Sequence, residues 1–113
     1  MIINGTNVKM TRGDTENITV ALYDTSNVLV PLVVGDTVYL TVKESSKTED
    51  IVLQKIVTTF IDGKAIIQIS HLDTSDKNYG TYLYDVQLTR ASGTVTTLVR
   101  PSEFKIEGEV TYE

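Results

Sequence analysis

The chain of 113 residues contains no cysteine. That absence excludes disulfide bonds, thiolate metal sites and cysteine nucleophiles. The fold must therefore be stabilised by burial and strand pairing alone, and the cellular compartment stays open.

Blocks of basic residues are also missing. The net charge is −5 and the pI is about 4.8. The closest approach to a basic cluster is Lys43 with Lys47, and it is flanked by Glu44, Glu49 and Asp50. A nucleic-acid backbone requires clustered Lys and Arg, so we expect no nucleic-acid partner.

No long hydrophobic run is present. The longest, residues 28–34, is interrupted by Pro31 and is far too short to span a bilayer. Residues 1–5 have neither the basic nor the apolar region of a signal peptide. We therefore expect no membrane partner and no export directed by this segment.

The composition is that of one folded domain covering residues 1–113. Hydrophobic residues make up 41% of the chain, which is enough to fill a core at this size, and the modest net charge is not typical of disorder. The polar tail, residues 108–113, is expected to form either a linker or a last short strand.

Apolar and polar residues alternate along most of the chain, which predicts strands, and no stretch has a convincing helical period. The expected strands and extended segments are residues 7–11, 16–23, 28–32, 38–43, 51–58, 64–69, 81–89 and 94–106. Seven or eight antiparallel strands separated by such turns predict an all-β sandwich of immunoglobulin-like, Greek-key topology.

The strand after Gly80 carries tyrosines at alternate positions. Tyr82, Tyr84, Val86 and Leu88 are expected to share one buried face. A Tyr just after a turn, two residues before another buried position, opens the sixth strand of an immunoglobulin-type sandwich, where its hydroxyl bonds to upstream backbone. We expect Tyr82 to form this tyrosine corner with the crossing before Gly80.

Glycine and aspartate mark the expected turns. Asp62-Gly63 is a preferred pair for a type I′ turn, in which both residues have positive φ, and it is expected to close a hairpin between its flanking strands. Residues 13–15 and 35–37 both read Gly-Asp-Thr and are interpreted as two similar turns. Pro101 lacks an N–H, so the last strand must be an edge there or contain a bulge.

No constellation of residues supports catalysis. His71 is the only histidine, no Ser-His-Asp order accompanies it, and no glycine-rich phosphate loop is present. The acidic residues weighed as Ca²⁺ ligands are Glu49, Asp62, Asp73 and Asp76. The spacing of a calcium-binding loop is absent, however, and Asp at a turn ordinarily caps the backbone. We expect no catalytic residue, no cofactor and no metal site.

The best candidate for an interaction surface lies in the outward register of the third and sixth strands of the expected sandwich, which are neighbours in one sheet. Tyr39 and Leu83 are expected beside each other there, amid Thr41 and Gln87. A small apolar spot with few charges favours contact, although single exposed apolar residues are normal on a monomer.

The pattern resembles the baseplate upper protein N-terminal domain family of tailed phages and prophages of Gram-positive bacteria. The resemblance extends from Gly13 to Thr111 and is carried by the order and spacing of several elements, among them the turn and strand of residues 35–43. Further matching positions are Asp62-Gly63, Asp73-Thr74, residues 80–86, Thr97-Leu98, Phe104, Ile106 and Val110-Thr111. The chain departs from the usual pattern at Asn27 and at Arg100-Pro101, where glycine is commoner.

The resemblance implies an immunoglobulin-like module that attaches and assembles parts of a virion, with no catalytic residues. We therefore expect a structural module of a phage tail, baseplate or similar appendage, made in the bacterial cytoplasm and located in the phage particle. Its partners would be other virion proteins or further copies of itself. The alternative is a carbohydrate- or ligand-binding sandwich from a bacterial surface or secreted protein.

Overall fold

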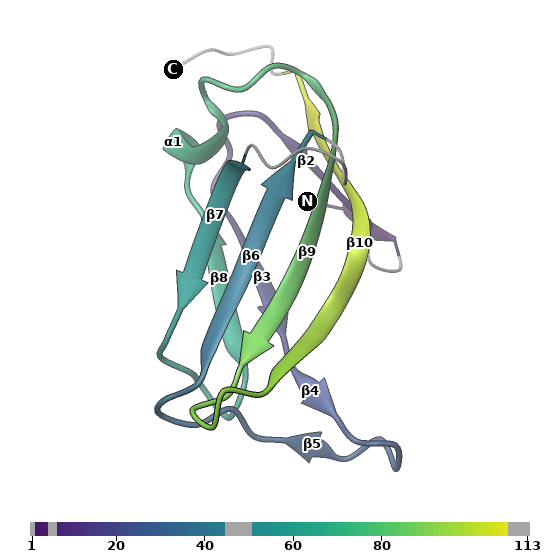
Figure 1. The fold of residues 1–113 in the computed structure, drawn as a ribbon. Helices are drawn as coiled ribbons and strands as arrows, with labels where there is room; N and C mark the ends of the chain where they lie inside the picture. The colour runs from purple at the N-terminus through teal and green to yellow at the C-terminus, as the bar shows by residue number, and fades with distance from the viewer. Residues whose placement is uncertain (1, 5–6, 45–50, 109–113) are drawn as a thin grey trace.

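The computed structural model describes residues 2–4, 7–44 and 51–108, and most of these residues lie in β-strands (Figure 1). The strands are β1 (Ile2–Asn4), β2 (Asn7–Thr11), β3 (Glu16–Val20), β4 (Leu22–Tyr23), β5 (Leu29–Val30), β6 (Thr37–Lys43), β7 (Ile51–Val57), β8 (Ala65–Ile69), β9 (Gly80–Thr89) and β10 (Val95–Glu107). One short helix, α1 (His71–Thr74), interrupts them. Of the tail at 108–113, all but Gly108 lies outside the described residues.

The larger sheet has the strand order β1-β2-β10-β9-β6-β7 and is mixed. Strand β10 pairs with β9 antiparallel but with β2 parallel, where Phe104 faces Val8 and Ile106 faces Met10. The prediction of a purely antiparallel fold is therefore wrong at this pair. Strands β2 and β10 lie near opposite ends of the chain, so no local turn constrains their relative direction.

A second layer consists of the antiparallel pair β3 and β8, which lies behind the larger sheet in Figure 1. Side chains from both layers form one hydrophobic core. Its buried residues are Val8, Met10, Ile18, Val20, Leu32, Val38, Leu40, Val42, Ala65, Ile67, Ile69, Tyr82, Tyr84, Val86, Leu88, Phe104 and Ile106. The predicted alternation is confirmed for β6 and β9, because every second side chain of each strand is buried.

The predicted strand 16–23 is divided in the structure. Strand β3 ends at Val20, and β4 leaves the second layer to pair with β5 in a small separate sheet. A turn of short polar residues joins β4 to β5, and in it the Asp24 carboxylate accepts hydrogen bonds from the N–H groups of Ser26 and Val28. This small sheet extends beyond one end of the two layers (Figure 1).

The turn at Asp62-Gly63 has the predicted conformation but a different role. Asp62 has φ of 53° and Gly63 has φ of 73°, as a type I′ turn requires. The predicted hairpin is wrong, however, because β7 pairs with β6 whereas β8 pairs with β3. Only Ile61 and Lys64 form a bridge across the turn. A hairpin there would leave β3 without a partner, and crossing to the second layer supplies one.

The segment between β8 and β9 crosses back to the larger sheet, as predicted, and contains the unpredicted helix α1. Ser70 and Asp73 form its capping box, in which the Asp73 carboxylate accepts a hydrogen bond from the Ser70 N–H at 2.7 Å. A single turn has too few residues to produce a helical period, so pattern alone does not reveal it.

The tyrosine corner is confirmed. The Tyr82 hydroxyl donates a hydrogen bond of 2.8 Å to the carbonyl oxygen of Asn78, in the crossing before Gly80. Tyr82 is 9% exposed, so this bond satisfies a nearly buried phenol and fixes the crossing against the start of β9.

Strands β9 and β10 form a long hairpin whose turn contains Gly93 with φ of 94°. Their register shifts between Thr97 and Val99 and again between Val99 and Ser102. The second irregularity contains Pro101, so of the two predicted alternatives, an edge or a bulge, the structure shows the bulge. Within the described residues, no helix is long and apolar enough to cross a membrane.

Candidate interaction surface

The four residues predicted for the interaction surface lie on the outer face of β6 and β9. These strands pair antiparallel, with Tyr39 opposite Gln87 and Leu83 opposite Lys43. Tyr39 and Leu83 are therefore not neighbours, because they lie at opposite ends of the paired region. Thr41 lies between them, opposite Asp85. The expected single apolar spot is corrected to two separate ones.

The neighbour of Tyr39 is Ile56 on β7. These residues are paired across β6 and β7, and Ile56 is 57% exposed. Beside them the Gln54 side-chain amide donates a hydrogen bond of 3.2 Å to the Thr41 hydroxyl. Sequence reasoning missed Ile56 because it paired β7 with β8, which left the strand beside β6 unassigned.

Leu83 lies at a shallow hollow in the same face. The hollow has a volume of about 320 Å³, and its lining includes Thr41, Lys43, Leu83, Asp85, Gln87 and Pro101. Pro101 reaches it from the irregular part of β10, where the register with β9 shifts. Three of the four predicted residues thus share this hollow, and Tyr39 lies outside it.

Asp85 is the residue of the hollow that sequence reasoning did not include. Its side chain is half-buried in the outward register of β9, between Leu83 and Gln87. Burial raises the pKa of Asp85, and the positive charge of Lys43 opposes that rise. Among the described residues, no hydrogen bond or ion pair satisfies its carboxylate. The alternation of β9 was the signal that could have placed it on this face.

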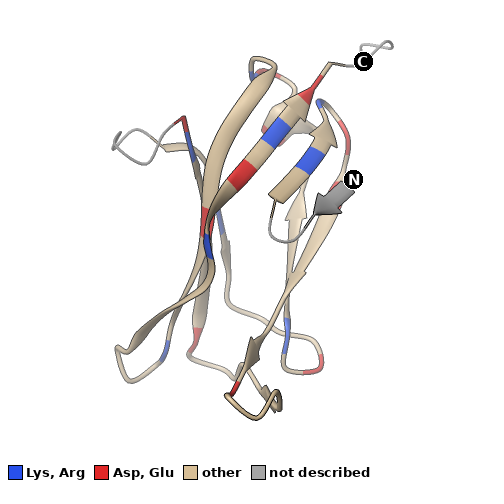
Figure 2. Ribbon diagram, turned by 90° about the vertical axis from the view of Figure 1, so that its right-hand side faces the viewer, with Lys and Arg blue, Asp and Glu red and all other residues tan. Residues whose placement is uncertain are grey.

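Charges are unevenly distributed over the outer face of the larger sheet. Among the described outward positions of β6, β7 and β9, the charged residues are Lys43 and Asp85. Charges of both signs lie side by side along β10 and β2 instead (Figure 2). There Lys9 and Glu107 form an exposed ion pair at 3.6 Å. The β6–β9 region is therefore the less charged part of the sheet.

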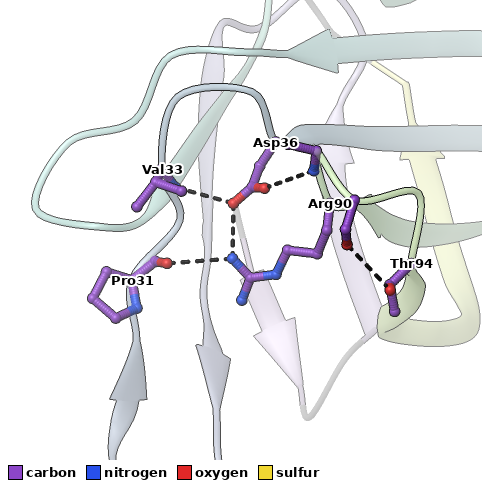
Figure 3. A network of polar contacts seen from close by, with 7 residues as sticks. Pro31, Val33, Asp36, Arg90 and Thr94 are labelled. Atoms are coloured by element: carbon purple, nitrogen blue, oxygen red, sulfur yellow. Dashed lines mark hydrogen bonds and ion pairs between the residues drawn. The ribbon is translucent and has the colours of Figure 1, made fainter.

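A second polar centre lies at one end of the molecule, where the loop before β6 meets the turn after β9 (Figure 3). One oxygen of the Asp36 carboxylate accepts hydrogen bonds from the Arg90 guanidinium at 2.8 Å and the Val33 N–H at 3.0 Å. Its other oxygen accepts from the Ala91 N–H at 3.2 Å. The guanidinium also donates to the Pro31 carbonyl at 3.4 Å.

Asp36 is 2% exposed, and the hydrogen bonds that its carboxylate accepts offset the cost of burying it. The bond from the Val33 backbone lowers the pKa of Asp36 most; burial opposes this effect, and Ala91 and Arg90 lower it further. The centre holds a loop that presents Val33 at 53% and Val34 at 95% exposure. We interpret this polar centre as structural, because both carboxylate oxygens of Asp36 accept hydrogen bonds from groups of the chain itself.

The acidic residues weighed as calcium ligands are dispersed. Asp73 caps α1 and forms an ion pair with Lys55 at 2.7 Å, and Asp62 lies in its turn. Asp76 contacts Lys77 at 3.5 Å, whereas Glu49 lies outside the described residues. Across residues 2–4, 7–44 and 51–108, no group of three or more His, Cys, Asp or Glu residues is placed to hold a metal ion. His71, the first residue of α1, is exposed.

Comparison with known proteins adds no relative: the chain matches no family model, no curated protein and no solved structure.

Proposed function

We propose that the chain is a non-catalytic assembly module that acts through protein–protein contacts. The observation that supports this most is the outer face of β6, β7 and β9, which has few charges and carries the paired side chains Tyr39 and Ile56. Contact surfaces are depleted in charge at their centre and enriched in aromatic residues.

For the fold we propose the immunoglobulin-like sandwich. The support is that β6, β9 and β10 are adjacent in one layer, β3 and β8 form the other, and Tyr82 makes the corner bond to Asn78. The parallel pairing of β2 with β10 departs from a purely antiparallel version. This departure concerns the pair β2 and β10, whereas β10, β9, β6 and β7 pair antiparallel throughout.

For the setting we propose a phage tail, baseplate or similar virion appendage, with other virion proteins or further copies of the chain as partners. This part depends on the resemblance of residues 35–43 and of the β9 segment to the phage baseplate domains described above. The corresponding location is the phage particle, after synthesis in the bacterial cytoplasm.

The alternative, a carbohydrate- or ligand-binding module, would have aromatic side chains outward on one sheet, where they stack on sugars, or clustered loop tips. Tyr23, Tyr39 and Tyr79 belong to three separate segments of the structure. One face of the Tyr79 ring already contacts Arg12, whose guanidinium carbon lies 4.2 Å from the ring centre. Among the described tyrosines, these positions favour the assembly module over the sugar-binding one.

The test begins with the genes beside the one encoding this chain. We expect tail and lysis genes there, and glycosidase genes would instead favour the carbohydrate-binding alternative. The purified chain is then examined by light scattering for self-association, and by pairwise binding to each tail protein that the neighbouring genes encode. Tyr39→Glu and Leu83→Glu are compared with Ile66→Glu, which alters a 40% exposed residue of β8 in the other layer.

We expect Tyr39→Glu and Leu83→Glu to weaken self-association or tail-protein binding by about tenfold or more, since a charge would be buried at the contact. Ile66→Glu should have little effect. A chain that stays monomeric at high concentration and binds none of the tail proteins would overturn the assembly proposal. Equal weakening by all three variants would reject the outer face of β6 and β9 as the surface.

A further inference from the structure

The hollow beside Leu83 is lined by one acidic group, Asp85, by one basic group, Lys43, and by apolar surface from Leu83 and Pro101. The Asp85 carboxylate is half-buried there, and within the described part of the chain it accepts no hydrogen bond and forms no ion pair. Other half-buried or buried carboxylates are satisfied: Asp36 by Arg90 and Asp73 by Lys55. An ionised carboxylate removed from water without a partner is unfavourable. Asp85 is therefore an acceptor that a binding partner could satisfy.

We propose that the hollow receives an arginine side chain of the partner protein, with its guanidinium bound to the Asp85 carboxylate. This inference rests on the assembly function proposed above and names the chemistry of its contact. A planar guanidinium presents five N–H donors, which suits the Asp85 carboxylate and the side-chain oxygen of Gln87 together. The methylene groups of arginine would pack against Leu83 and Pro101.

The size and charge of the site agree with this occupant. A hollow of about 320 Å³ lies at the lower end of the range for small-molecule pockets, roughly 300–1,000 Å³, so it suits one side chain. The chain has a net charge of −5, which attracts a cationic surface at long range. Lys43, which also lines the hollow, repels a cation, so its removal should strengthen the interaction.

The test titrates the 113-residue chain with N-acetyl-arginine amide as the probe, and NMR detects binding through chemical-shift changes of the protein. N-acetyl-citrulline amide is the matched control ligand, because it has nearly the same shape and no charge. We expect saturable shifts at the amides of Leu83, Asp85 and Gln87 and at the Asp85 carboxyl carbon. Citrulline should bind about tenfold more weakly, as expected when a charge-assisted hydrogen bond is lost.

Three variants separate this site from general attraction of a cation to an acidic protein. Asp85→Asn should weaken binding of the arginine probe about tenfold. Glu103→Gln removes an exposed charge from neighbouring β10 and should leave probe binding unchanged. Lys43→Gln should strengthen binding of the arginine probe about twofold. Equal binding of the citrulline probe, unchanged binding to Asp85→Asn, or absence of saturable shifts at the hollow would each overturn the inference.

The outcome is distinguishable from that of the assembly proposal. If Tyr39→Glu abolishes binding of a tail protein while the arginine probe does not bind, the assembly function stands and the arginine site is rejected. If the probe binds at Asp85 and no tail protein or second copy binds the chain, the hollow recognises a guanidinium, but its assignment to an assembly partner is rejected.

Discussion

Asp36 and Arg90 lie 54 positions apart in the sequence, and their side chains form an ion pair of 2.8 Å at the end of the molecule. The pair joins the loop before β6 to the turn between β9 and β10 (Figure 3). Two segments that carry no strand pairing of their own are thereby held together. The stability of this end should depend on one carboxylate.

The first prediction compares the two Gly-Asp-Thr turns. Asp36→Asn should lower the free energy of unfolding by roughly 3 kcal/mol, because it leaves Arg90 without its counter-charge in a largely buried site. Asp14→Asn changes the same residue of the same tripeptide where the side chain is exposed, and should cost less than about 0.5 kcal/mol. Urea unfolding measures both, and equal losses would contradict the role assigned to Asp36.

The second prediction concerns acid pH. The pKa of Asp36 lies below its ordinary value of 3.8, so its stabilisation is fully present above that value and is lost as the pH falls through the folded-state pKa. The gap in unfolding free energy between the native protein and Asp36→Asn should therefore be constant from pH 7 to about 5 and narrow below pH 4. A gap that stayed constant to pH 2 would show that the charge of Asp36 is not what stabilises the loop.

The third prediction concerns Asp85, whose pKa is shifted in the opposite direction to that of Asp36. Burial raises the pKa of Asp85, so its charge opposes folding above the folded-state pKa, and this penalty disappears below the unfolded value of 3.8. Asp85→Asn should be more stable than the native protein at pH 7, by up to about 1 kcal/mol, and equally stable at pH 3. Thermal melts at the two pH values measure the difference, and a loss of stability at pH 7 would contradict it.

The fourth prediction tests the tyrosine corner. Tyr82→Phe removes the donor to the Asn78 carbonyl and should cost about 1–2 kcal/mol. Tyr23→Phe is the control, because Tyr23 is 49% exposed on β4 and its change should be within about 0.5 kcal/mol. An unaltered denaturant midpoint in Tyr82→Phe would show that the hydrogen bond contributes nothing.

The fifth prediction separates backbone strain from steric overlap. Gly63 and Gly93 have φ of 73° and 94°, so alanine at either position should cost about 1 kcal/mol. A Cβ at Gly63 would also lie 3.0 Å from the Cα and Cβ atoms of Pro31, whereas none of the described atoms outside its chain neighbours lies within 4 Å at Gly93. Gly63→Ala should therefore be the more destabilising of the two in urea unfolding.

Much of the local structure was determined by the sequence. The alternation of residues in β6 and β9 predicted which side chains are buried, because successive residues of a strand point to opposite faces. The Tyr82 corner, the Asp62-Gly63 turn and the bulge at Pro101 were predicted for equally local reasons: a hydroxyl near a turn, residues that accept positive φ and a missing N–H.

Only the tertiary structure decided which strands are partners and which polar groups are satisfied. Sequence alternation is the same whether β7 pairs with β8 or with β6, and it contains no information on the parallel pairing of β2 with β10. Asp14 and Asp36 stand in the same Gly-Asp-Thr tripeptide, yet one is exposed and the other is buried against Arg90. Burial and ion pairing depend on segments far apart in the chain, and no local pattern specifies which distant residues meet.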